Sequence, residues 1–123
     1  MNLNSVLIGS EDPGRLTTYY SGLFGAPGWE MGPYRGWQLG QGFLTIGPHD
    51  EVKGANASPG RLIWNLETPD VQGDFERLKA AGAIVIAAPY SMDQDGDQAP
   101  SLISTFADPD GNLFQLVSPM PMP

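Results

Sequence analysis

Hydrophobic and polar positions alternate along the first half of the chain in a way that predicts a strand, a helix and three further strands. Residues 3–9 form a short apolar run of β type. A helix is predicted to begin at Ser10 or Asp12 and to end at Gly25, since apolar side chains recur there at helical spacing. Three runs bounded by glycine or proline follow and are typical of strands in a meander: 29–31, 36–39 and 43–46.

The second half repeats this order of elements after a polar, turn-rich linker at 48–60. Residues 61–67 are strand-like, the stretch Thr68-Pro69-Asp70 offers a helix cap, and the helix it starts is predicted to end before Gly82. Three more strands are predicted, at 83–88, 101–106 and 112–117. We therefore expect one domain of residues 1–123 with two βαβββ modules, at about 1–50 and 60–119, and a loose tail at 118–123.

Composition narrows the class of protein. Hydrophobic residues make up 41% of the 123 residues, which is typical of a globular chain, and the 16 glycines and 12 prolines imply many turns. The absence of cysteine excludes disulfides, thiolate metal sites and thiol catalysis. No apolar run approaches the length that spans a membrane, and the first residues lack a basic leader, so we expect a cytoplasmic protein without a membrane partner.

The charge balance argues against nucleic acid as a partner. Fourteen acidic against six basic residues give a net charge of −8, which would repel phosphates. Three of the acids alternate in Asp93-Gln-Asp95-Gly-Asp97, which is similar to the first half of a calcium loop. No bidentate glutamate follows them, so we interpret this segment as a solvated loop.

Two motifs carry a family resemblance. Asp12, Tyr19-Tyr20 and Leu23-Phe-Gly25 follow the first strand, and the compact turn Asp108-Pro-Asp-Gly-Asn112 precedes the last one and predicts a β-hairpin. Together with the repeated modules, they resemble the vicinal oxygen chelate superfamily, whose members include glyoxalase I, bleomycin-resistance proteins and extradiol dioxygenases. The resemblance implies an α+β fold in which the two βαβββ modules form curved mixed sheets around a cavity, in a chain that is commonly a homodimer.

The same resemblance implies where a metal would be held, because enzymes of the superfamily usually bind it through two histidines and two glutamates on the first, fourth, fifth and eighth strands. Aligned strand by strand, these positions are Ser5, Thr45, Arg61 and Gln115. None offers a carboxylate or an imidazole, and arginine would add a fixed positive charge. We therefore expect no metal, no other cofactor and no assigned catalytic residue.

The only histidine, His49, lies in the linker beside Asp50 and Glu51, and we interpret it as a surface residue. A metal site that these three residues complete with a second chain is the alternative.

Strand alternation identifies candidate ligand-binding residues, since every second side chain would face the cavity. The inward set combines apolar and hydrogen-bonding groups, as pockets for small organic ligands do: Ser5, Phe43, Thr45, Arg61, Ile63, Asn65 and Gln115. Their neighbours, including Leu62, Trp64 and Phe114, should pack beneath the helices. An ion pair is the alternative role for Arg61.

Aromatic residues on or near the middle strands are further candidates, because they could stack on a planar ligand. Trp37 and Tyr90 are included in the site for this reason, and Trp29 and Tyr34 lie near Trp37. A place in the core or at a dimer interface is the alternative for all of them.

Two functions remain open at this point. The first is a metal-independent small-molecule-binding protein that sequesters an antibiotic or a metabolite. The second is a lyase, isomerase or dioxygenase of the same superfamily with a non-standard or absent metal site. No residue type in the inward set has an ordinary pKa near neutral pH, so general acid–base catalysis lacks an obvious agent and the first hypothesis is favoured.

Overall fold

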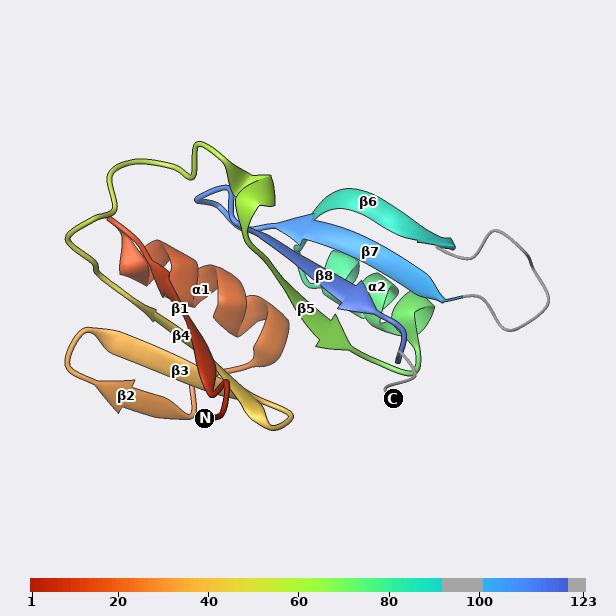
Figure 1. Ribbon diagram of the computed structural model, residues 1–123, viewed down its shortest axis with the longest axis horizontal. Coiled ribbons are helices and arrows are strands. Elements are labelled where there is room, and N and C mark those ends of the chain that lie inside the picture. The colour runs from red at the N-terminus through yellow and green to blue at the C-terminus, as the bar shows by residue number, and fades with distance from the viewer. Residues whose placement is uncertain (92–100, 120–123) are drawn as a thin grey trace. The chain divides into compact units, whose positions relative to one another are not determined.

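The computed structural model describes residues 1–91 and 101–119, and it divides the chain into two compact units with the same order of elements. The units are Met1–Asn56 and Ala57–Pro123, so their boundary falls within the predicted linker. Each contains a strand, a helix and three further strands (Figure 1). The α+β class and the repeated βαβββ modules are therefore confirmed. The acidic segment at 93–97 and residues 120–123 of the predicted tail lie outside the described residues.

The first unit is a four-stranded mixed sheet with one helix. Its elements are β1 (Ser5–Gly9), α1 (Pro13–Phe24), β2 (Trp29–Met31), β3 (Tyr34–Leu39) and β4 (Gly42–Gly47). The strand order is β1-β4-β3-β2, with β1 parallel to β4 and the other neighbours antiparallel.

The second unit repeats this topology. A 3₁₀ turn, η1 (Pro59–Arg61), precedes β5 (Ile63–Glu67), α2 (Val71–Ala80), β6 (Ile84–Ser91), β7 (Leu102–Ala107) and β8 (Leu113–Val117). The order β5-β8-β7-β6 again pairs the first strand of the unit in parallel with the last. The remaining neighbours are antiparallel, with register shifts along β6.

Both helices begin where the sequence predicts a cap. Asp12 accepts a hydrogen bond from the backbone N–H of Arg15 (3.1 Å), which decides between the two predicted starts of α1. Asp70 accepts one from the N–H of Gly73 (2.9 Å) at the start of α2. The hydroxyl of Thr68 in turn accepts from the N–H of Asp70 (3.1 Å). These side chains satisfy backbone donors that have no partner within the helix.

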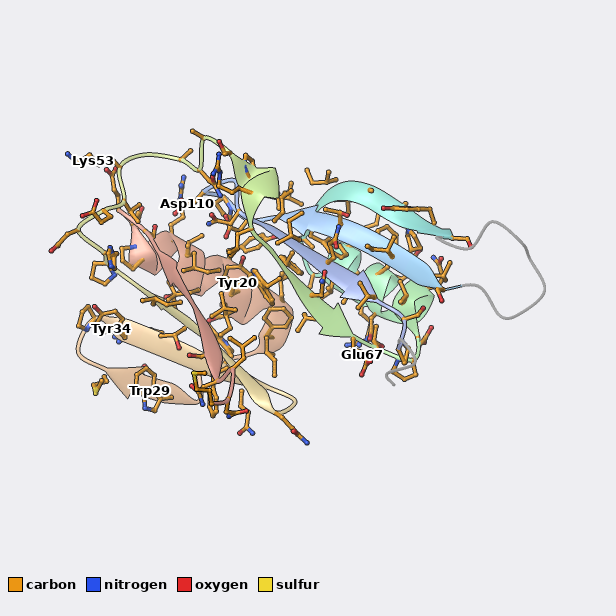
Figure 2. The ribbon with its side chains drawn as sticks, in the orientation of Figure 1. Tyr20, Trp29, Tyr34, Lys53, Glu67 and Asp110 are labelled. Atoms are coloured by element: carbon orange, nitrogen blue, oxygen red, sulfur yellow. The ribbon has the colours of Figure 1, made fainter. Side chains whose placement is uncertain are left out.

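Each helix covers one face of the sheet in its own unit. In the first unit Leu16 and Tyr20 of α1 are fully buried, and Figure 2 labels Tyr20 on the helix. In the second, Phe75 of α2 packs on Phe106, whose ring also stacks on Phe114 with centroids 5.1 Å apart. Burying each such side chain contributes about 1.5–3 kcal/mol, so these contacts are a main source of stability within each unit.

Several predicted boundaries are wrong in detail. The first strand begins at Ser5 rather than at residue 3, and Leu3 is 93% exposed. The fifth begins at Ile63, because η1 occupies the residues before it, and Leu62 is 71% exposed instead of buried. Ser118, the first residue of the predicted tail, is hydrogen-bonded to β7, since its N–H donates to the carbonyl of Leu102 (3.0 Å).

Within the described residues, no helix has the length and apolar content that crossing a membrane would require.

Candidate functional site

The turn between β7 and β8 is organised around the buried carboxylate of Asp108. Asp108, 2% exposed, accepts hydrogen bonds from the backbone N–H groups of Asp110 (2.9 Å) and Asn112 (3.0 Å). The side-chain amide of Asn112 donates to the same carboxylate (2.9 Å), and Gly111 adopts a φ of 86°. Such a positive φ suits glycine. The predicted hairpin is therefore confirmed, and its aspartate holds the turn.

The sheet of the first unit has an open face opposite α1, and three predicted site residues lie on it. Register pairs Ser5 with Phe43 and Leu7 with Thr45 on adjacent strands. Phe43 is 38% exposed, whereas the next residue, Leu44, is 2% exposed on the helix side. The predicted alternation is therefore correct for β1 and β4.

In the second unit, the face of the sheet away from α2 has more polar groups, and it is exposed along β5 but buried along β7, where Thr105 is 7% exposed. Ile63 pairs with Leu113 and Asn65 with Gln115. The side-chain amide of Gln115 donates to the hydroxyl of Thr105 on β7 (3.0 Å), so the protein itself orients this amide. A further predicted residue of this unit, Tyr90, lies on the edge strand β6 opposite Ile103 and is 49% exposed.

Arg61 does not lie on the strand where the sequence places it. It ends the 3₁₀ turn η1 and is exposed, two residues before β5 begins. The sheet registers show which residue of β5 holds the position that the family resemblance assigned to Arg61. Leu7 pairs with Thr45 as Asn65 pairs with Gln115, so in the repeat Thr45 is equivalent to Gln115.

By the same equivalence, the counterpart of Ser5 on β5 is Ile63. The prediction that Arg61 lies on a strand is wrong because Pro59 and Gly60 fold the chain into η1, which ends at Arg61.

Trp37 also departs from its predicted role. It pairs with Leu44 on the helix side of the sheet and is 2% exposed. Its indole N–H donates to the carbonyl of Gly25 (2.8 Å), and its ring lies 6.4 Å from that of Tyr20 between centroids. Trp37 therefore has the core role that the sequence left open, and it does not share a face with Phe43 and Thr45.

Two aromatic rings that were not included in the predicted site lie on the open face of the first unit. A Cβ placed on Gly36 would come within 2.9 Å of Cε3 of Trp29, and one placed on Gly47 would overlap the ring of Tyr34. Figure 2 labels both rings beside β2 and β3. Glycine at these positions of β3 and β4 is the sequence signal that could have located them, because it leaves room for a side chain from the neighbouring strand.

The residues available for a metal ion do not fit one. Among residues 1–91 and 101–119, no three histidine, aspartate or glutamate side chains are grouped as an ion would require. His49 is exposed, and its Nδ1 accepts a hydrogen bond from the backbone N–H of Glu51 (3.1 Å).

The four positions implied by the resemblance, corrected for the observed register, hold two hydroxyls, an alkyl chain and an amide: Ser5, Thr45, Ile63 and Gln115. Divalent transition metals bind imidazole, carboxylate or thiolate groups, none of which is present in this set.

Comparisons with known proteins agree with the observed topology. The model of the glyoxalase-like domain family matches residues 5–117. The chain therefore belongs to the glyoxalase-like domain family, within the vicinal oxygen chelate superfamily. No curated protein matches it.

Solved structures share this fold at low sequence identity. A glyoxalase-related enzyme from Fulvimarina pelagi is 21% identical with a TM-score of 0.70, covering 96% of this chain and 88% of its own. A glyoxalase/bleomycin resistance protein/dioxygenase family enzyme from Burkholderia phytofirmans PsJN is 20% identical with a TM-score of 0.69, covering 98% and 100%. A glyoxalase/bleomycin resistance protein/dioxygenase from Alicyclobacillus acidocaldarius reaches 0.73 at 12% identity, covering 98% and 92%. At these identities the likeness shows the fold and leaves the activity open.

Proposed function

We propose that this chain is a metal-independent small-molecule-binding protein of the glyoxalase/bleomycin-resistance type, which sequesters an antibiotic or a metabolite. The observation that carries the proposal is the donor set at the implied metal positions. Ser5 and Thr45 provide neutral hydroxyls, Gln115 an amide and Ile63 no donor at all. Such a set can hydrogen-bond an organic guest but binds divalent cations weakly.

Each sheet adds further candidate ligand-binding residues on the face away from its own helix. Phe43 and Ile63 offer apolar contact, and Asn65 and Gln115 offer amides from paired strands. A few convergent polar groups among apolar ones are typical of small-molecule sites. Tyr90 would add an exposed ring at the edge of β6. We include Arg61 as a positive charge near the start of β5, outside the sheet.

Further elements of the proposal rest on the family and the composition. The family model runs through both units, so we propose that they act as one domain. A homodimer is the state implied for this superfamily, and the absence of cysteine suits a reducing cytoplasmic compartment.

Thermal-shift titration tests this function. The protein is titrated with Ni²⁺, Zn²⁺, Fe²⁺ and Mn²⁺, and separately with a panel of aromatic, cationic and anionic organic compounds. A ligand that binds only the native state raises the unfolding temperature by mass action. We expect stabilisation by an organic compound and none by the ions. Stabilisation by an ion at micromolar concentration, with no response to the organic panel, would contradict the proposal.

Arg61 has a test of its own with one pair of probes, 2-naphthoate and the neutral 2-naphthalenemethanol. If the guanidinium assists binding, Arg61→Ala should weaken the anion several-fold and leave the neutral compound unchanged, since an exposed ion pair contributes about 0.2–1 kcal/mol. Lys53→Ala, which removes another exposed positive charge, is the matched control. Equal losses for both probes would remove Arg61 from the site.

A further inference from the structure

The open face of the first unit is rich in exposed apolar side chains although it belongs to a strongly acidic chain. Exposed fractions on this face are 49% for Leu7, 43% for Trp29, 62% for Met31 and 38% for Phe43. The solvent face of a helix-covered mixed sheet is normally polar, because alternation places the apolar residues on the other side. Apolar groups gathered on an exposed face mark an interaction site.

Among the residues that the structure describes, the strand positions on this face include no charged side chain. The strand registers give its positions as Ser5, Leu7, Gly9, Trp29, Met31, Tyr34, Gly36, Gln38, Phe43, Thr45 and Gly47. The charged residues of β2 and β3, Glu30 and Arg35, lie on the opposite face and pair with each other at 3.4 Å. We expect the part of a ligand that contacts this face to be uncharged. Moving a charge out of water without a partner costs more free energy than the new contacts would supply.

Gly36 lies beside the two side chains that could hold such a ligand, Trp29 and Thr45. The nearest side-chain atoms to a Cβ built on Gly36 are Cε3 of Trp29 at 2.9 Å and Oγ1 of Thr45 at 3.7 Å. The indole of Trp29 therefore rests on the strand beside the Thr45 hydroxyl, held there by the absence of a side chain at Gly36. A planar ring can stack on an indole, and a hydroxyl beside it can bond one polar substituent.

From this geometry we infer that the open face of the first unit binds a neutral planar aromatic ring, stacked on Trp29 and anchored by the hydroxyl of Thr45. Phe43, two residues before Thr45 on β4, bounds the ring on one side. Any charge on the guest lies away from this face. The inference rests on the proposed function and adds the chemical class of the group that this unit accepts.

Indole N–H signals in a nitrogen–proton correlation NMR spectrum provide the test. The chain has three tryptophans, at 29, 37 and 64, and Trp29→Phe identifies which signal is Trp29. The probes are 2-naphthalenemethanol, a neutral planar ring, and tetramethylammonium, a cation that would bind an indole through its π face. We expect the neutral ring to shift the Trp29 signal while the buried Trp37 signal stays in place, and tetramethylammonium to shift neither.

Variants quantify the contact. Trp29→Ala should weaken 2-naphthalenemethanol about tenfold, the factor that corresponds to an aromatic pair of roughly 1.4 kcal/mol. Trp29→Phe should retain most of the affinity. Gly36→Ala should also weaken binding, because its methyl group displaces the indole without removing it. Ile86→Ala on β6 is the control, since it removes a 58% exposed apolar side chain from the other unit.

Three outcomes would overturn the inference. The first is binding of the neutral ring with no change in the Trp29 signal, which leaves the proposed function intact but moves the ring elsewhere. The second is a Trp29 response to tetramethylammonium alone. The third is a Trp29 signal that moves with protein concentration in the absence of probe, together with a sedimentation coefficient that falls in Trp29→Ala, which would make this face a contact between copies of the chain.

Discussion

A single buried carboxylate, Asp108, illustrates how one residue can fix the geometry of a strand pair. Its oxygens accept bonds from two backbone N–H groups and one side-chain amide across five residues of chain. The same turn closes β7 onto β8, which carries Gln115 on its open face. This part of the motif that carried the family resemblance therefore has a conformational role: it fixes the turn that leads into β8.

Removing this carboxylate should destabilise the protein. Asp108→Ala leaves buried N–H groups of the turn without their acceptor, and each such loss costs about 1–3 kcal/mol. The free energy of unfolding from urea titration is the measurement. Asp50→Ala, which removes an exposed acid from the linker, should change it by less than about 0.5 kcal/mol. A loss for Asp108→Ala no larger than that of its control would show that the carboxylate does not hold the turn.

At the scale of elements, strand β4 carries a glycine because β3 presents a ring to it. A Cβ on Gly47 would overlap the ring of Tyr34, which comes just before Arg35, the register partner of Ile46. Gly9, the partner of Gly47 on β1, is covered in the same way by His49 and Val52. One end of the open face is therefore closed by side chains that lie over these glycines.

A double-mutant cycle measures this packing. Gly47→Ala should lower the free energy of unfolding by about 1–3 kcal/mol, because overpacking forces the ring or the strand to move. In a Tyr34→Ala background the same substitution should cost less, or even stabilise, since alanine restricts the unfolded chain more than glycine does. Equal costs in both backgrounds would indicate that the ring does not occupy the space above Gly47.

Sequence patterns correctly predicted the repeated order of elements and the alternation of side chains between the two faces of the sheet in β1, β4 and β8. Leu44, Phe114 and Leu116 are buried as predicted, because a two-residue period sorts side chains whenever a helix covers one face. The pattern failed where local turn chemistry competes with strand propensity. Pro59 and Gly60 fold the chain into η1, and this moves Arg61 off the strand.

Tertiary packing accounts for what the sequence could not decide about the aromatic residues. Trp29 and Trp37 lie on neighbouring strands at similar distances from turns, and local sequence does not distinguish them. Register does, because Trp29 pairs with Gly36 and Trp37 with Leu44, which places the two rings on opposite faces. Only the indole of Trp37 is buried against α1, at 2% exposure.

At the scale of the whole molecule, the repeat relates the residues that would define a metal site. Thr45 and Gln115 are equivalent in the two units, and so are Ser5 and Ile63. If the two modules shared a metal-binding pattern, the two residues of each equivalent pair would carry the same kind of metal-coordinating side chain. Here one pair combines a hydroxyl with an amide and the other a hydroxyl with an alkyl chain, so neither module retains half of a metal site.

Metal stoichiometry is the most direct measurement of this account. The wild-type protein and a variant with the family's donors installed, Ser5→His, Thr45→Glu, Ile63→His and Gln115→Glu, are incubated with Ni²⁺ or Zn²⁺, desalted, and analysed by inductively coupled plasma mass spectrometry. We predict negligible metal in the wild type, because it offers no imidazole or carboxylate group at these positions, and the variant, which offers both, is the comparison. About one metal ion per wild-type chain that survives desalting would contradict the proposal that an organic guest, and no metal, occupies the site.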